Sequence, residues 1–339
     1  MRVSAIALAL VFLAGSLSAE TWDLSTIDDA GIVGQHASIA IRWGRTHVAY
    51  YDMTNQDLKY AVSDDDKTWK IEVVDSNGNV GEYASICVDI KGVPHISYYD
   101  GTNHDLKYAT KAGSTWKTDV VDAGFAGMYS SIAVDSSYGV YISYLSMAGY
   151  DLKCVYGVPG NWTTMITDFT GSVGWGSSIA VDGKDRAHIS YNDNAANTLR
   201  YATNANGSFD VTYLDPTEVA PPTAIAVDPM GVVHIAFLAN GTLRYTHNGS
   251  SGFVTETVDD SIGPEEYDLS IATFEDGRPV ITYYDATHTE LRLARKNEEW
   301  AWTINVIDQG GTYNAVCVDE DGRIRIAYFN FAALRYAIN

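Results

Sequence analysis

Six aromatic side chains stand at similar places in a repeating pattern, each a few residues before a short apolar segment of the type SIAVD. Sugars present apolar C–H faces and many hydroxyl groups. A sugar-binding site therefore needs aromatic rings to stack on and carboxylates or amides to accept hydrogen bonds. The pattern predicts a ligand-binding ring at one mouth of a central channel, made of His36, Tyr83, Tyr129, Trp175, Tyr267 and Tyr313.

Trp175 departs from the register of its equivalents by one residue, within the segment GSVGWGSS. Because glycines flank it, we expect its ring to be little covered and to contribute strongly to binding. The alternative role for all six aromatic residues is to fill gaps between neighbouring repeats.

The sequence evidence for a metal site or a catalytic site is weaker than that for the aromatic ring. The segment DSNGNVG, with Asp75, Asn77 and Asn79, is a weak calcium candidate that lacks a downstream bidentate Glu. The sequence contains no G-x-S-x-G, H-E-x-x-H, P-loop or C-x-x-C motif, so we predict no catalytic residue, no metal site and no cofactor. Four histidines share one repeat position and are expected to pack within the repeats: His47, His95, His188 and His234.

The elements that would position these residues repeat at intervals of 45 to 47 residues. Each copy holds four short β-rich runs separated by Gly, Asp, Asn and Ser clusters, and none has a helical period. Such a pattern is typical of a β-propeller, so we predict an all-β fold of seven four-stranded antiparallel blades. The SIAVD-type segments of the seven copies begin at Ser38, Ser85, Ser131, Ser178, Ala224, Ser270 and Ala315.

The two ends of the chain predict how the ring closes. The last copy stops after its third strand, whereas the segment TWDLSTID at residues 21–28 resembles a fourth strand. We therefore expect the N-terminal strand to complete the last blade, which removes an exposed sheet edge. In each fourth strand an aromatic residue precedes an Asp by six positions, as Trp22 precedes Asp28 and Trp69 precedes Asp75.

Residues shared by all copies are explained most simply by the blades themselves. An aromatic residue of the second strand is expected to fill the space between sheets, and the Asp that follows in Tyr-Tyr-Asp segments to cap the next loop. The third strand carries a base in every copy, which is expected to pair with the strand-terminal aspartates: Lys59, Lys107, Lys153, Arg200, Arg244, Arg292 and Arg335.

The first 19 residues are expected to be a signal peptide, because a short basic end precedes an apolar run and a small-residue cleavage site. Residues 20–339 are then a single propeller domain that is secreted or periplasmic, with no membrane insertion. The chain has 43 acidic and 22 basic residues, a net charge of −21, which makes nucleic acid an unsuitable partner. Cys87, Cys154 and Cys317 are expected to be unpaired core residues.

The turns before the fourth strands read SDDDKTW, TKAGSTW and TNANGSF. With the repeats, they resemble the sialidase-like, or bacterial-neuraminidase-repeat, group of secreted seven-bladed propellers, whose Asp-box is S-x-D-x-G-x-x-W. The aromatic position is kept but the Asp-Gly core is not. The resemblance implies a propeller fold. It does not extend to a sialidase catalytic motif, since no arginine triad stands at non-repeating positions.

Three functions remain open from the sequence. The first is non-enzymatic binding of a glycan or an extracellular protein, through the face that carries the long inter-blade loops. The second is a glycan-active enzyme, either a sialidase-like hydrolase or a polysaccharide lyase. The third is a structural envelope or interaction module. We expect the first, and the sequence does not fix the oligomeric state.

Overall fold

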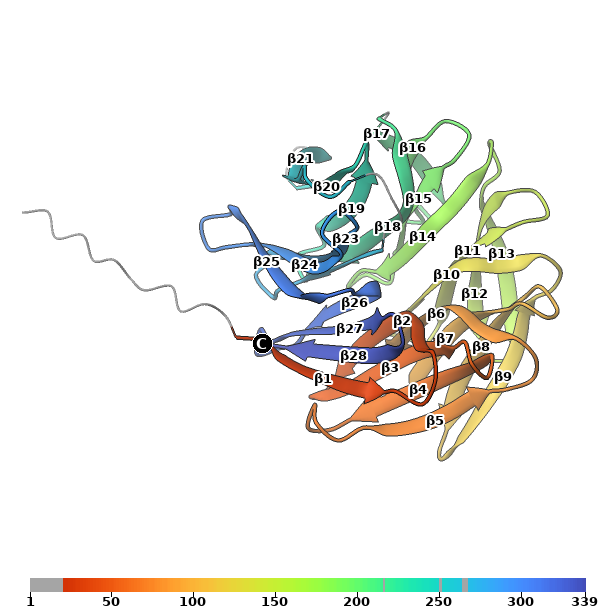
Figure 1. The fold of residues 1–339 in the computed structure, drawn as a ribbon. Helices are drawn as coiled ribbons and strands as arrows, with labels where there is room; N and C mark the ends of the chain where they lie inside the picture. The colour runs from red at the N-terminus through yellow and green to blue at the C-terminus, as the bar shows by residue number, and fades with distance from the viewer. Residues whose placement is uncertain (1–20, 216, 250–251, 264–267) are drawn as a thin grey trace, which may run out of the picture.

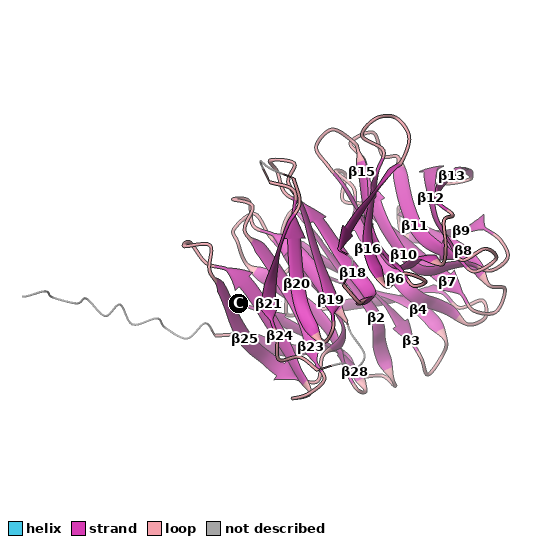
Figure 2. Cartoon of the chain, turned by 90° about the horizontal axis from the view of Figure 1, so that it is seen from above, coloured by secondary structure: helices cyan, strands magenta, loops and turns pink. Residues whose placement is uncertain are grey.

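The computed structural model describes residues 21–215, 217–249, 252–263 and 268–339, and the expected leader lies outside them. Within these ranges the regular elements are strands, which form seven four-stranded antiparallel sheets around a central axis (Figures 1 and 2). The prediction of a seven-bladed β-propeller is therefore confirmed. The described part contains no helix long and apolar enough to cross a membrane.

In six blades the four strands follow one another outward from the channel in chain order, and in the last blade β1 takes the outermost place. The innermost strands are β2 (Val33–Arg42), β6 (Val80–Val88), β10 (Ala126–Val134), β14 (Val173–Val181), β18 (Val219–Val227), β22 (Leu269–Thr273) and β26 (Thr312–Val318). The second strands are β3 (Arg45–Asp52), β7 (Pro94–Asp100), β11 (Val140–Ser146), β15 (Ala187–Asp193), β19 (Val233–Ala239), β23 (Pro279–Asp285) and β27 (Ile324–Asn330).

The outer half of each blade is its third and fourth strands. The third strands are β4 (Asp57–Ser63), β8 (Asp105–Ala112), β12 (Asp151–Val158), β16 (Thr198–Thr203), β20 (Thr242–His247), β24 (Glu290–Lys296) and β28 (Ala333–Ile338). The fourth strands are β5 (Lys70–Asp75), β9 (Thr115–Asp122), β13 (Asn161–Asp168), β17 (Asp210–Asp215), β21 (Val254–Asp259), β25 (Trp302–Gln309) and β1 (Asp23–Asp28).

The N-terminal strand closes the ring as predicted. β1 pairs antiparallel with β28, so the last sheet has the order β1-β28-β27-β26 (Figure 1). Asp23 stands opposite Ile338 and Leu24 opposite Ala337. This pairing covers an edge of β28 that would otherwise expose unpaired N–H and C=O groups.

The hydrophobic core lies between neighbouring blades, because each sheet packs face to face against the next. The cluster at the seam between the last and the first blade shows this, since Val48 and Tyr50 of β3 pack with Ala327 of β27 and Leu334 of β28. All four of these side chains are fully buried. The second-strand tyrosine is therefore a core residue, as expected from its presence in nearly every copy.

Each of these tyrosines also contributes to a polar contact that joins two blades. Tyr98 donates a hydrogen bond of 2.7 Å to Asp75, and Lys107 lies 2.5 Å from the same carboxylate oxygen. Asp75 ends the outer strand of one blade, and Tyr98 and Lys107 belong to the next. Equivalent base–aspartate pairs occur at the other six seams, which confirms the expected pairing: Lys59–Asp28, Lys153–Asp122, Arg200–Asp168, Arg244–Asp215, Arg292–Asp259 and Arg335–Asp308.

The aspartate of the Tyr-Tyr-Asp segments caps the following hairpin, also as expected. Asp100 accepts the backbone N–H groups of Thr102 and Asn103 at 3.0 and 2.9 Å. It lies 3.8 Å from Lys107, so one base links the cap and the blade seam. The Tyr-Tyr-Asp motif is thus part of the scaffold.

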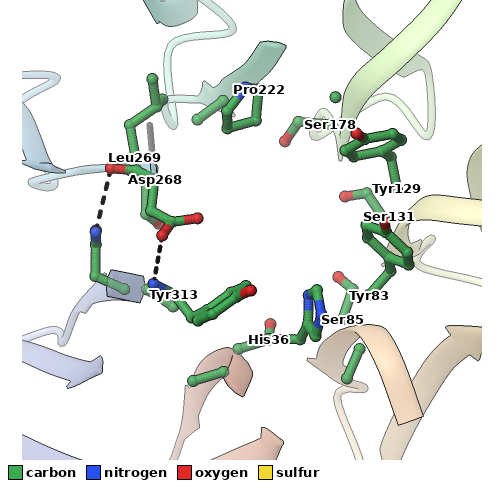
Figure 3. A pocket seen from close by; sticks show the side chains of 18 of the residues that line it. His36, Tyr83, Ser85, Tyr129, Ser131, Ser178, Pro222, Asp268, Leu269 and Tyr313 are labelled. Carbon is green, nitrogen blue, oxygen red and sulfur yellow. Dashed lines mark hydrogen bonds between the residues drawn. The ribbon is translucent and has the colours of Figure 1, made fainter. Parts of the chain in front are cut away.

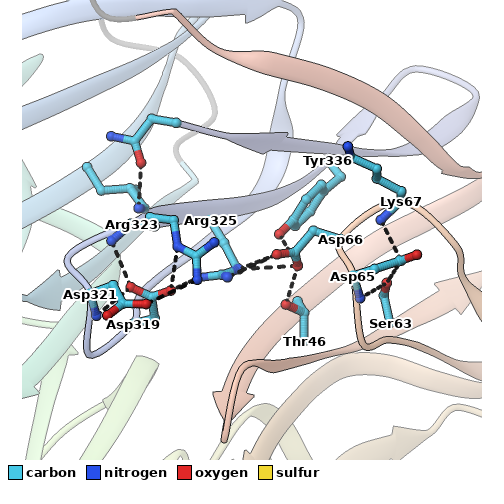
Figure 4. Close-up of polar contacts among 12 residues, drawn as sticks. Thr46, Ser63, Asp65, Asp66, Lys67, Asp319, Asp321, Arg323, Arg325 and Tyr336 are labelled. Carbon is cyan, nitrogen blue, oxygen red and sulfur yellow. Dashed lines mark hydrogen bonds and ion pairs between the residues drawn. The ribbon is translucent and has the colours of Figure 1, made fainter.

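The seam between the last and the first blade has a buried ion pair of its own (Figure 4). The fully buried Arg325 of β27 lies 2.9 Å from Asp66, which belongs to the β4–β5 connection of the first blade, and 2.7 Å from Asp319. Asp66 also accepts hydrogen bonds from Thr46 and Tyr336. Hydrogen bonds from both blades therefore satisfy the buried charges.

The histidine position of the second strand packs inside the blade. His47 Nδ1 lies 2.6 Å from the Tyr60 hydroxyl of the neighbouring third strand, and both side chains are buried. Three other blades repeat this contact as His95–Tyr108, His188–Tyr201 and His234–Tyr245. The expected packing role is confirmed for all four histidines. The cysteines are unpaired, as expected; Cys154 is buried in the core, whereas Cys87 and Cys317 are partly buried and pack against core clusters.

Candidate functional site

A cavity of about 710 Å³ occupies the end of the channel at which the innermost strands begin. Its wall contains residues 35–38 of β2 and the equivalent residues of the other inner strands. Phe331, in the hairpin between β27 and β28, also lines it. The cavity therefore opens on the face that carries the second-to-third connections, and its volume falls within the usual range for small-ligand sites.

A β-bulge places the aromatic residues on the cavity wall. Gln35 pairs with Tyr51 and Ser38 with Ala49, so His36 and Ala37 together oppose one residue of β3. The bulge turns the backbone of His36 into the left-handed region, with φ of 51°. The same arrangement recurs at three tyrosines, with φ of 53° at Tyr83, 54° at Tyr129 and 49° at Tyr313. Bulges of this kind re-aim a side chain, here toward the channel.

Four of the six predicted residues form one continuous aromatic wall (Figure 3). The ring centroids are 4.5 Å apart between Tyr313 and His36, 4.8 Å between His36 and Tyr83, and 4.8 Å between Tyr83 and Tyr129. All four line the cavity and are half-buried. The wall thus presents π faces and edges from four adjacent blades.

Trp175 lies elsewhere than the sequence led us to expect. It pairs with Asn192 at the position that Gln35 takes in β2, so the bulge residue of β14 is Gly176, with φ of 57°. Gly176 lines the cavity, whereas Trp175 is not among the lining residues.

The indole of Trp175 is half-buried and is covered more than expected. It stacks on Tyr150 at a centroid distance of 6.3 Å and an interplanar angle of 7°, and its Nε1 donates a 2.9 Å hydrogen bond to Ser172. It touches the aromatic wall only through Tyr129, at 5.9 Å. Its one-residue departure from the register therefore moves it away from the cavity.

The sixth predicted residue, Tyr267, lies outside the described residues. In that blade the cavity is lined by Asp268, two residues before Ser270, which sequence reasoning missed. Its carboxylate accepts a 2.7 Å hydrogen bond from the backbone N–H of Tyr313. Figure 3 shows Asp268 across the cavity from Tyr83 and Tyr129. Counting two residues back from Ser270, as His36 stands before Ser38, would have located Asp268.

Serine hydroxyls form a second tier of the wall, just below the aromatic residues. Ser85 accepts a backbone N–H from Ile132 of the next blade at 3.2 Å, and Ser131 accepts one from Ile179 at 3.1 Å. Ser38, Ser178 and Ser270 accept equivalent bonds. Because each oxygen accepts a backbone hydrogen bond, its own O–H remains available as a donor. The serines therefore join the blades and also give the cavity hydroxyl groups.

The electrostatics of the wall follow from burial. Burial lowers the pKa of His36 to about 4, so its imidazole is neutral at physiological pH. Burial likewise raises the pKa of Tyr83 and of Tyr129, which keeps both phenols protonated. Among the described lining residues, Asp268 is the one acidic side chain, and none is Lys or Arg.

The weak calcium candidate is held by protein hydrogen bonds. Asp75 accepts bonds from Tyr98, Lys107 and the backbone of Asn77. The amide oxygen of Asn79 accepts a bond of 2.7 Å from Tyr51. The oxygens of this segment therefore serve the blade seam and the loop around it.

One other group of potential metal ligands occurs among the described residues, at Asp285, His288 and Glu290. The guanidinium of Arg292 lies 2.8 Å from Asp285 and 2.9 Å from Glu290, and it also contacts His288. This group is thus built around an arginine, whose positive charge opposes metal binding.

No family model matches the chain, and no curated protein matches it by sequence. Solved structures do match its fold. A catalytically inactive variant of virginiamycin B lyase from Staphylococcus aureus, crystallised with quinupristin, matches with a TM-score of 0.64 and 10% identity. The match covers 94% of this chain and all of the lyase.

Two other proteins also match. A triple arginine-to-alanine variant of AofleA from Arthrobotrys oligospora has a TM-score of 0.59 and 13% identity, over 86% of this chain and 90% of that one. The lectin of Aleuria aurantia in complex with Fucα1-6GlcNAc has a TM-score of 0.57 and 15% identity, over 81% of this chain and 96% of the lectin. At these identities the similarity concerns the propeller fold.

Proposed function

We propose that this protein is a secreted, non-enzymatic carbohydrate-binding propeller whose site is the cavity lined by Tyr313, His36, Tyr83 and Tyr129. The observation that carries the proposal is the continuous aromatic wall facing a carboxylate, Asp268, across a cavity of about 710 Å³. Aromatic faces stack on the apolar face of a sugar, and the carboxylate and hydroxyls bind its hydroxyl groups.

The backbone of the wall supports a functional role for its side chains. Left-handed φ angles at bulky residues cost about 1 kcal/mol or more each, and such strain is concentrated at functional sites. The blade with Gly176 demonstrates that glycine also fits this position. Aromatic residues at four blades therefore carry a conformational cost that a purely structural bulge would avoid.

The comparisons support a glycan ligand at the level of the fold. The Aleuria aurantia lectin, which matches over most of this chain, was crystallised with Fucα1-6GlcNAc and with α-methyl-L-fucoside. The resemblance to sialidase-like repeats, which rests on the turns before the fourth strands, remains a prediction.

Binding accounts for the described cavity wall better than glycoside hydrolysis does. Most glycosidases use two carboxylic acids that flank the scissile bond. Asp268 is the one carboxylate among the described residues that line this cavity. A glycan-active enzyme therefore stays the alternative, and the experiment must include a test for it.

The experiment is a glycan-array screen of residues 20–339, with a reducing-end release assay on every glycan that binds. We expect binding to a limited set of glycans and no release of new reducing ends. Release of reducing ends from a bound glycan would favour the enzymatic alternative, and a blank array would contradict the proposal.

A further inference from the structure

The charge inside the cavity selects among sugars. Asp268 brings one negative charge to the wall, and the described lining residues include no Lys or Arg. His36 adds no positive charge at neutral pH because burial lowers its pKa to about 4. The described part of the lining is therefore acidic, within a chain whose net charge is −21.

A second carboxylate belongs to the residue that precedes one of the wall tyrosines. Glu82 precedes Tyr83 in β6 and accepts a 3.1 Å hydrogen bond from the side chain of Asn79. Its negative charge, after the larger effects of burial and of Tyr129, raises the pKa of the Tyr83 phenol. Glu82 therefore acts electrostatically on Tyr83, a residue of the wall.

Aromatic faces beside a carboxylate are suited to a cation. The negative face of an aromatic ring attracts an ammonium group within about 6 Å of its centroid, and desolvation strengthens the attraction. A charge-assisted hydrogen bond between an ammonium and a carboxylate is about twice as strong as a neutral one. The same wall would disfavour a carboxylated sugar, because the negative charge of the sugar would meet the carboxylate of Asp268.

We propose that the cavity binds a sugar with a free, protonated amine in preference to a neutral N-acetylated sugar or an acidic one. The inference rests on the proposed carbohydrate-binding function and specifies its ligand class. Asp268 holds the ammonium group, while the rings of Tyr313, Tyr83 and Tyr129 contact the apolar face of the sugar.

The experiment compares three tetrasaccharides of matched length by isothermal titration calorimetry. The probes are β1-4-linked tetraglucosamine, its fully N-acetylated form, and tetragalacturonate, which are positive, neutral and negative. We expect tetraglucosamine to bind at least tenfold more tightly than its N-acetylated form, and tetragalacturonate to bind most weakly.

Two isosteric variants separate the cavity from the overall charge of the protein. Asp268→Asn removes the charge of the wall but keeps an oxygen that can accept the N–H of Tyr313. Glu275→Gln removes one exposed charge at the opposite end of the channel, in a second cavity lined also by Asp228 and Asp319. We expect Asp268→Asn to weaken tetraglucosamine binding at least tenfold and Glu275→Gln to leave it within twofold of wild type.

The outcomes distinguish this inference from the proposed function. Equal losses in the two variants would show attraction to the whole acidic protein and would overturn the inference. The inference would also be overturned if the N-acetylated or the acidic tetramer bound more tightly than tetraglucosamine. It would be overturned as well if the array found only neutral glycans and tetraglucosamine did not bind. In the last case the proposed function stands, whereas absence of binding to every glycan defeats both.

Discussion

The hydroxyl of Tyr50 donates a 2.6 Å hydrogen bond to the carboxylate of Asp28, and so connects the first complete blade to the strand that closes the ring. Lys59 lies 2.6 Å from the same oxygen, and all three side chains are buried. The N-terminal strand therefore closes the ring in two ways. β1 covers the edge of β28, and Asp28, its last residue, neutralises the buried Lys59 of the next blade.

Removing residues 21–28 is predicted to open the ring. The edge of β28 becomes exposed, and Lys59 loses the nearer of its two carboxylate partners while remaining in an apolar seam. We expect a large fall in the melting temperature together with aggregation, measured by circular dichroism and light scattering. An unchanged melting curve in the truncated protein would mean that β1 does not close the ring.

Arg325→Met is predicted to destabilise the protein by about 3–5 kcal/mol, because it leaves the carboxylates of Asp66 and Asp319 without their buried partner. Arg323→Met is the matched control, since Arg323 contacts the same Asp319 but its side chain is 48% exposed. We expect the control to change the free energy of unfolding by no more than about 0.5 kcal/mol. Urea denaturation measures both, and equal losses would contradict this account of the seam.

Acid is predicted to destabilise the protein in two stages. Burial lowers the pKa of His36 and of His47 to about 4. In the unfolded chain both histidines have a pKa of about 6.5, so between pH 6.5 and pH 4 the unfolded chain binds protons that the folded protein does not. The free energy of unfolding therefore has its full value above pH 6.5 and falls as the pH falls toward 4.

The second stage of acid destabilisation involves aspartates at the blade seams. Burial alone would raise the pKa of Asp28 and of Asp75, but hydrogen bonds from Lys59, Tyr50, Lys107 and Tyr98 outweigh it and lower both. The two aspartates therefore stabilise the folded protein above about pH 3.9, the pKa of Asp in the unfolded chain, and this stabilisation is lost as the pH falls below that value. Urea midpoints from pH 8 to pH 3 measure both stages. Stability that stays constant down to pH 4 would contradict the histidine stage.

Three free thiols are predicted per chain. Cys87, Cys154 and Cys317 are unpaired, and burial raises the pKa of each thiol, to about 12 for Cys317. Because the thiolate is the reactive form, a thiol reagent should label the native protein slowly. Titration in denaturant without reductant should give three thiols, and a count below three would indicate a disulfide.

The scaffold could be predicted from the sequence because the repeats carry it. The seven SIAVD-type segments at regular intervals implied seven blades, and the segment at residues 21–28 matched the missing fourth strand. The Asp and the base that recur in every copy implied the contacts between neighbouring blades. Many copies share these features, so a strand that is assigned wrongly in one repeat can be recognised by comparison with the other repeats.

The candidate site was predicted less completely because it depends on where the blades differ. A bulge selects the residue that faces the channel, so a shift of one position replaces Trp175 by Gly176. The prediction selected aromatic residues and did not count positions back from each SIAVD segment, so it did not include Asp268. The serine tier was visible in the SIAVD segments, but its bonds to the next blade depend on how close neighbouring inner strands lie.

The most direct test of the proposed binding cavity is Tyr129→Gly. Gly176 occupies the equivalent bulge of the next blade, so glycine removes the ring without straining a left-handed backbone. Tyr138→Gly is the matched control, because Tyr138 also has a positive φ, of 68°, but lies in the turn after β10, at the opposite end of the inner strand. The measurement is the dissociation constant of the tightest glycan from the array, by calorimetry, for wild type and both variants. The account predicts folded variants, at least a tenfold weaker affinity for Tyr129→Gly, about 1.4 kcal/mol, and an unchanged affinity for Tyr138→Gly. A folded Tyr129→Gly variant that binds as tightly as wild type would contradict it.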